Sequence, residues 1–223
     1  MKNLYLLTLA VLFAFNSSAQ HDFGLSLNGA LSKTIETENY ILNTLHKIEY
    51  QSLYNPSYNF GIYYNLHISK HLLFGSDILF TEIEGNEIID ITYIENPGYS
   101  YNTYRKHLSY LSLPVYFGLK FEKTSFYIGF MPSLLLKSKE LWKRTVVHNE
   151  IVSHDRADRY LSCYDADYGP KIGLRYNIKD NLIIEASYYY GLKRINEYEN
   201  RTWKNQQISL GFRYTLFTTK KPE

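Results

Sequence analysis

Cysteine is nearly absent from this sequence of 223 residues, with Cys163 as its only example. A single cysteine cannot form an intramolecular disulfide and cannot supply a cysteine-rich zinc site. A glycine-rich phosphate-binding loop is also missing. The charges nearly cancel, with 24 Lys and Arg against 22 Asp and Glu, so no basic field marks a nucleic-acid-binding protein. We therefore expect no cofactor, no metal centre and no nucleic-acid partner.

Long apolar runs are confined to the first residues of the chain. A positive start at Lys2 precedes an apolar stretch at residues 4–15, which has the length found in signal peptides. Small residues before and at Ala19 predict cleavage there, so residues 1–19 are predicted to be a signal peptide and residues 20–223 a single domain. Beyond that site no window approaches the roughly 20 apolar residues of a membrane-spanning helix. If the mature chain crosses a membrane, it must cross with β-strands.

Helical periodicity is almost absent from the mature chain. Apolar and polar residues instead alternate over segments of about ten residues, which is the pattern of a strand with two unlike faces. In residues 58–69, for example, Phe60 and Ile62 share one parity while Gly61 and Asn65 share the other. The alternation predicts an all-β chain with strands at about residues 23–33, 58–69, 72–83, 107–120, 126–137, 168–177, 182–191 and 207–216.

The connections between these segments alternate in length. They are long at about 34–57, 84–106, 138–160 and 194–204, and short near residues 70, 122 and 180. Outer-membrane barrels have short periplasmic turns and longer extracellular loops, and an even number of strands returns both ends to the periplasmic side. The 23 tyrosines, whose rings carry a polar tip, suit the interface between lipid and water. The sequence thus predicts an eight-stranded antiparallel up-and-down transmembrane β-barrel in the cell outer membrane.

Side-chain volume decides which face of this barrel points outward. The apolar parity supplies about five large side chains per strand, whereas the interior of an eight-stranded barrel is only just wide enough to be filled by side chains. The other parity is rich in Gly, Ser, Asn and Thr, which fit a narrow polar lumen. We therefore expect the apolar face to contact outer-membrane lipid, as in a membrane barrel and unlike a soluble one.

Five charged residues share the inner parity: Asp77, Lys171, Arg175, Glu185 and Arg213. Burial of a charge without a partner is costly, so these residues are predicted to form an ion-pair network across the lumen. The cluster could be the gate of a proton-linked pore, or it could be structural filling that plugs the barrel. A barrel of eight strands leaves little room for a channel, which favours the plug.

Several segments resemble, in order, strands of the Bacteroidetes outer-membrane β-barrel family that includes PorT-like proteins. These segments are GIYYNLHISKHLLFGSDILFTEIEG at 61–85, YLSLPVYFGLKF at 110–121, FYIGFMPSLLLKSK at 126–139, DYGPKIGLRYNIKDNLIIEASYYYGLKRI at 167–195 and NQQISLGFRYTLF at 205–217. The resemblance implies an outer-membrane barrel, and the family shares no single activity that could be carried over. Pro114 and Pro132 suit central strands only at bulges or where the ladder is relaxed.

No constellation of residues predicts catalysis or metal binding. Ser153, His154 and Asp155 are the nearest candidates for a lipid-modifying triad, but adjacent residues seldom place a Ser and a His side chain for mutual hydrogen bonding. His148 and Asp158 lie nearby, yet they match no known ligand spacing. We expect ordinary loop polarity here.

The leading hypothesis is a non-enzymatic, monomeric outer-membrane barrel that binds a protein or glycan partner through its extracellular loops or periplasmic turns. Residues 93–104 form an aromatic-rich loop segment, in which Tyr99, Tyr101 and Tyr104 are the candidate contact surface. The alternatives are a loop that packs on its neighbours, a narrow pore for small solutes or ions, and a lipid-modifying enzyme.

Overall fold

The computed structural model describes residues 20–38, 46–93, 98–148, 151–159, 165–193 and 201–219. The predicted signal peptide at residues 1–19 and Cys163 lie outside these ranges. The described residues form the strands β1 (Gln20–Glu38), β2 (His46–His67), β3 (Leu72–Tyr93), β4 (Gly98–Ser112), β5 (Val115–Phe121), β6 (Thr124–His148), β7 (Ile151–Arg159), β8 (Ala166–Lys179), β9 (Leu182–Tyr190) and β10 (Arg201–Thr219). No helix in the described ranges is long and apolar enough to cross a membrane.

The strands close into an antiparallel ring, because β1 pairs with β2 on one side and with β10 on the other. β4 and β5 occupy one position in the ring, since both pair with β3 and with β6. The break between them falls at Leu113 and Pro114, where proline cannot donate a hydrogen bond to the ladder. β7 and β8 likewise both pair with β6. The ring therefore has the eight strand positions that the alternation predicts.

The two faces of the ring are as side-chain volume predicts. On the outer face Leu27, Ile128 and Leu210 are each more than 60% exposed, although they are large and apolar. The inward side chains of the same strands are polar and buried, as at Asn28 and Ser209. Such an inside-out distribution is stable only when lipid covers the outer face, so the prediction of an outward apolar face is confirmed.

Glycines make room for tyrosine rings in the lumen. A Cβ atom at Gly75 would overlap the ring of Tyr116, and one at Gly173 would overlap the ring of Tyr127. At Gly29, on the outer face, the nearest atom to an added methyl group would be 4.0 Å away. Gly75 and Gly173 are therefore required by the close approach of these two tyrosine rings.

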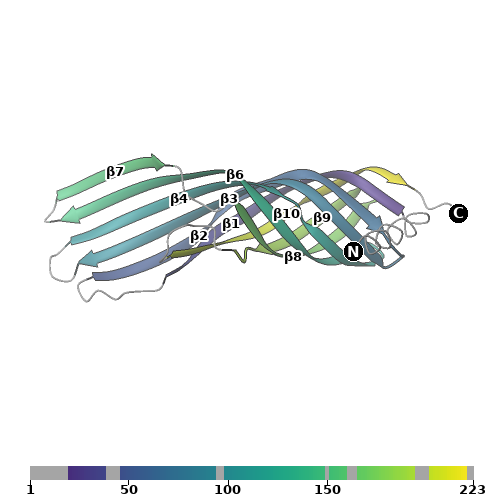
Figure 1. Cartoon of the computed structure of the whole chain (residues 1–223), viewed down its shortest axis with the longest axis horizontal. Coiled ribbons are helices and arrows are strands. Elements are labelled where there is room, and N and C mark those ends of the chain that lie inside the picture. The colour runs from purple at the N-terminus through teal and green to yellow at the C-terminus, as the bar shows by residue number, and fades with distance from the viewer. Residues whose placement is uncertain are drawn as a thin grey trace, which may run out of the picture.

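The structure overturns the prediction of long extracellular loops. Much of the segments 34–57, 84–106 and 138–160 is strand, because β2, β3, β4 and β6 continue past the ring and β7 pairs alongside β6. These five strands form an open sheet that extends from one side of the barrel (Figure 1). The outward face of the extension meets water and carries polar and charged residues, while its inward face buries polar and apolar residues alike, such as Glu87 and Ile89. The extension therefore lacks the apolar–polar alternation of a strand with one face toward lipid.

The ring narrows where this extension begins. The β2–β3 register shifts between Tyr54 and Asn59, which leaves residues 82–84 of β3 without partners in β2. Side chains from across the lumen replace the missing ladder. The Ser32 hydroxyl accepts a hydrogen bond from the Glu84 backbone N–H at 2.8 Å and lies 3.0 Å from the Glu84 carbonyl, to which it donates. Gln207 Nε2 donates to the carbonyl of residue 82 at 3.0 Å.

Gly75→Ala should destabilise the barrel, because the new methyl group would displace the Tyr116 ring from its place in the lumen. We expect a cost of about 1–3 kcal/mol, as for overpacking in a protein core. The matched variant Gly29→Ala adds the same methyl group on the open outer face and should change stability by less than about 0.5 kcal/mol. Urea unfolding in lipid vesicles, followed by the heat-dependent shift in gel mobility, measures both. Equal stability of the two variants would contradict this packing role.

Candidate functional site

The five charged residues predicted to share the lumen come from four strands: Asp77 from β3, Lys171 and Arg175 from β8, Glu185 from β9 and Arg213 from β10. Each is at most 4% exposed. The structure therefore buries all five in the lumen and brings into contact side chains that are up to 136 residues apart in the chain.

Arg213 is the centre of a buried layer of charged side chains. Its Nη2 atom forms an ion pair with Asp77 Oδ2, and its Nε atom lies 2.6 Å from Glu185 Oε2. Its Nη1 atom donates a hydrogen bond to the Tyr116 hydroxyl at 3.0 Å. A guanidinium offers five N–H donors in a fixed fork, so one arginine can join two carboxylates from opposite sides.

Arg175 completes the layer from β8. Its Nε atom donates to Glu185 Oε2 at 2.6 Å, so one carboxylate oxygen contacts both arginines. The Arg175 guanidinium also lies 4.4 Å from the ring centre of Tyr116 and 4.3 Å from that of Tyr127. Cation–π contacts of this kind strengthen when water is excluded. Lys171 is buried nearby, but among the described residues it pairs with no carboxylate.

The sequence did not identify the neutral members of the layer. The Tyr116 hydroxyl lies 2.8 Å from Asp77 Oδ1 and 2.9 Å from Asn65 Oδ1, and Arg175 Nη1 is 3.4 Å from the same amide oxygen. The alternation does place Asn65 and Tyr116 among the inward residues, and both have polar groups that can form hydrogen bonds. Parity alone does not tell which inward side chains meet.

This layer closes the lumen. The side chains that surround Arg213 are each at most 2% exposed and so are packed closely around it; they are Tyr63, Asp77, Tyr116, Arg175 and Glu185. Toward the short-turn end, a cavity of about 380 Å³ reaches Arg175 and is lined there by Asp22, His67 and Lys120. The ionic layer is the inner wall of that cavity.

Further polar contacts fill the lumen on the other side of this layer. Asn28 donates to Asn59 at 2.7 Å, and Asn59 donates to Gln207 at 3.1 Å. Asn205 Nδ2 lies 2.9 Å from Asp167 Oδ2 and 3.1 Å from the Tyr110 hydroxyl. Beyond them Lys106 Nζ and Glu87 Oε2 form a buried ion pair at 2.7 Å. The lumen is therefore filled mainly by polar contacts, with an apolar cluster of Ile83, Leu108 and Tyr110 among them.

The structure does not bring the three tyrosines of the candidate contact surface, Tyr99, Tyr101 and Tyr104, together on one face. Residues 98–112 form strand β4, so most of the segment interpreted as a loop is a strand. Tyr101 and Tyr104 are an odd number of positions apart and so point to opposite faces, with Tyr101 38% exposed and Tyr104 half-buried. The side chain of Tyr99 lies outside the described set. Tyr101 and Tyr104 therefore cannot share one contact surface.

The serine and histidine of the candidate lipid-modifying triad also lie on opposite faces of their strand. Ser153 and His154 are consecutive residues of β7, and His154 Nδ1 contacts Thr145 Oγ1 at 3.1 Å instead. Among the described residues, no group of three or more His, Cys, Asp or Glu side chains is placed to hold a metal ion.

A family model described as "Outer membrane protein beta-barrel domain" matches residues 13–197. The comparison with curated proteins gives no match. Among solved structures, the chain is similar to Neisserial surface protein A, with 13% identity, 87% of this chain and 97% of that chain covered, and a TM-score of 0.38. It is also similar to Ail of Yersinia pestis in complex with sucrose octasulfate, with 12% identity, coverage of 88% and 99%, and a TM-score of 0.40. For OprG of Pseudomonas aeruginosa the identity is 8%, the coverage is 92% and 97%, and the TM-score is 0.42.

Arg213→Leu should be among the most damaging substitutions in the chain. It leaves Asp77 and Glu185 buried without their shared partner, and breaking a buried ion pair in this way costs roughly 3–5 kcal/mol. Arg156→Leu removes an exposed arginine whose contact with Asp158 is 4.0 Å long, and should cost less than about 1 kcal/mol. Urea unfolding of both variants in lipid vesicles tests this. A loss at Arg213 no larger than that at Arg156 would refute the central role of the layer.

Proposed function

Because this chain belongs to the outer membrane protein beta-barrel domain family and lies in the outer membrane, we propose that it is a non-enzymatic anchor that presents a partner-binding sheet outside the cell. The observation that carries the proposal is the open sheet of β2, β3, β4, β6 and β7, which extends past the apolar outer face (Figure 1). The ring itself is sufficient to hold the protein in the membrane. The extension is a surface that membrane insertion does not require.

The orientation follows from the family. Short turns lie on the periplasmic side of such barrels, and the beginning of β1 and the end of β10 lie at that same end of the molecule (Figure 1). The open sheet is at the opposite end, and so it faces the outside of the cell. A partner of this surface would be a protein or a glycan reachable from there.

The outward face of the sheet near its tip is the contact surface that we propose. Tyr101 pairs in register with Thr145, which in turn pairs with His154, so these three side chains lie side by side on β4, β6 and β7. Val152, next along the same face of β7, is 53% exposed at a level beyond the apolar belt of the barrel. Aromatic and apolar groups exposed beside polar ones are typical of protein interaction surfaces. β7 adds an outer edge, since among the described strands it pairs only with β6.

We further propose that the chain belongs to the PorT-like branch of outer-membrane barrels and that it has no enzymatic activity. The order of the strand motifs supports the Bacteroidetes branch that includes PorT-like proteins. The opposite orientation of Ser153 and His154 argues against a lipid-modifying triad. The buried layer around Arg213 argues against a pore, because ions would have to cross closely packed side chains that are each at most 2% exposed.

Purified, folded protein should give no steady channel conductance in planar lipid bilayers, because the ionic layer blocks the lumen. The variant Arg213→Ala/Arg175→Ala, which removes both guanidinium groups from the layer, serves as the comparison where it folds. A steady conductance from the unmodified protein, well above the lipid background, would show that the barrel is a pore and contradict the proposed anchor function.

A photo-crosslinking residue in place of Tyr101 should give a discrete adduct with a protein or glycan in intact cells. The same residue in place of Ile128, which is 65% exposed in the lipid-facing belt, should give adducts with lipid only. Mass spectrometry of the purified adducts separates the two results. If position 101 gives no adduct while position 128 reacts with lipid, the outward face of the sheet is not a partner surface.

A further inference from the structure

One wall of the barrel changes abruptly from apolar to charged side chains. The outward row Phe80–Leu111–Leu134, across β3, β4 and β6, is the last fully apolar one. The next rows in register are Glu82–Ser109–Lys137, Glu84–His107–Lys139, Arg105–Leu141–Asp158 and Thr103–Lys143–Arg156. On β2 the outward residues beyond Phe60 include Tyr58 and Tyr54 instead. The charged surface therefore belongs to the wall of β3, β4, β6 and β7.

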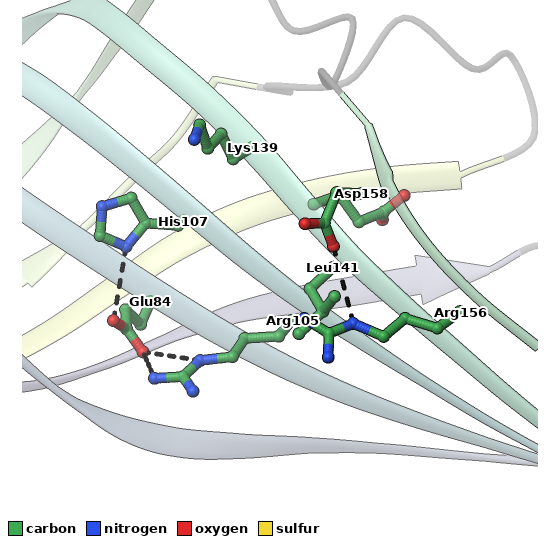
Figure 2. A pocket seen from close by; sticks show the side chains of 8 residues that line it. Glu84, Arg105, His107, Lys139, Leu141, Arg156 and Asp158 are labelled. Atoms are coloured by element: carbon green, nitrogen blue, oxygen red, sulfur yellow. Dashed lines mark hydrogen bonds and ion pairs between the residues drawn. The ribbon is translucent and has the colours of Figure 1, made fainter.

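These rows contain a hollow of about 410 Å³ on the outer surface, which we call the wall pocket (Figure 2). It is lined by Glu84, Arg105, His107, Lys139, Glu140, Leu141, Arg156 and Asp158. Four of these side chains are cationic or become so on protonation, and they come from three strands. The lining therefore offers N–H donors on several sides of one hollow.

The acidic side chains of the pocket hold some of its cations in place. Glu84 Oε2 accepts hydrogen bonds from Arg105 Nη2 at 2.7 Å and from Arg105 Nε at 3.2 Å, and Glu84 Oε1 is 3.4 Å from His107 Nδ1 (Figure 2). Arg156 Nε is 4.0 Å from Asp158 Oδ1. Lys139 is exposed and pairs with no described carboxylate. Arg105 is fixed with more than half of its side chain still open to solvent.

The height of the wall pocket indicates its ligand. Successive rows are two residues apart, or about 7 Å along a strand and roughly 5 Å along the membrane normal for a strand tilted by about 40°. The row that contains Lys139 is two rows beyond the last apolar one, and the row that contains Arg156 is four rows beyond it. The wall pocket therefore lies between about 10 and 20 Å past the apolar belt. Lipid headgroups begin at the edge of the hydrocarbon and extend about 5 to 8 Å in an ordinary bilayer, and further where the headgroup is a sugar. At that height the pocket lies beyond an ordinary phospholipid headgroup and at the level of a larger sugar headgroup.

We propose that the wall pocket binds the phosphorylated sugar headgroup of a glycolipid in the outer leaflet. Lys139 and Arg156 would contact its phosphate, because ammonium and guanidinium groups are the preferred partners of phosphate oxygens. The carboxylates of Glu84 and Asp158 would accept hydrogen bonds from its hydroxyl groups. This proposal is independent of the partner surface, since the pocket faces lipid and the tip of the sheet does not.

The test uses the full mature chain in phosphatidylcholine nanodiscs, with bisphosphorylated lipid A as the probe and native mass spectrometry as the readout. We expect the Lys139→Gln/Arg156→Gln variant to bind it at least about tenfold more weakly, which corresponds to the loss of one charged hydrogen bond. The matched control Lys120→Gln/Lys123→Gln removes two positive charges at the periplasmic end and should bind as the unmodified protein does. The heat-dependent gel shift confirms that each variant is folded.

Two further probes separate the possible sources of phosphate. Dephosphorylated lipid A should bind at least about tenfold more weakly than the bisphosphorylated form, and inorganic phosphate at millimolar concentration should not displace the lipid. Equal binding of the two forms of lipid A, or an equal loss in the control variant, would overturn the proposal. Displacement by inorganic phosphate would also overturn it, because the pocket would then be a site for free phosphate.

Discussion

The narrowness of an eight-stranded ring is the constraint on which the rest of this structure depends. The lumen holds side chains and little else, so every inward residue must fit its neighbours in both volume and charge. Arg213 can be buried there because Asp77, Glu185 and Tyr116 surround it. Gly75 is required because the ring of Tyr116 occupies the space of its side chain. The same few contacts therefore fill the lumen and neutralise its buried charges.

The membrane explains why the ring is closed in one part of the molecule and open in another. Within hydrocarbon, each backbone N–H and C=O must find a partner in the protein, which only a closed set of strands provides. In water the same groups can bind solvent, so strands are free to separate. The β1–β2 ladder ends at Ser32 and Asn55, and beyond it β2 continues on β3 alone. The open sheet thus begins where the membrane no longer imposes closure.

The fold could be predicted from the sequence wherever one face of a strand meets lipid. Leu210 and Gly211 alternate because their surroundings differ, and this contrast gave the strand number and the outward face. The same contrast is missing in β7, where residues such as His154 and Asp155 both meet water, so the sequence pattern predicts a loop there. In the lumen, parity identified Arg213 and its partners as inward residues. It could not show that Lys171 lies outside the ion pairs, because that depends on the stagger between strands.

The wall of β3, β4 and β6 connects the partner surface and the wall pocket. These strands carry the buried ion pair of Lys106 and Glu87 on their inner face, at the level where the wall pocket lies on the outer face. Lys106 pairs in register between residues of β3 and β6, so the three strands are held together at that level. A headgroup bound at Lys139 would contact the base of the sheet at the level of this ion pair. Because the same strands run on to Tyr101, the lipid contact would fix the direction in which the sheet presents its tip to a partner.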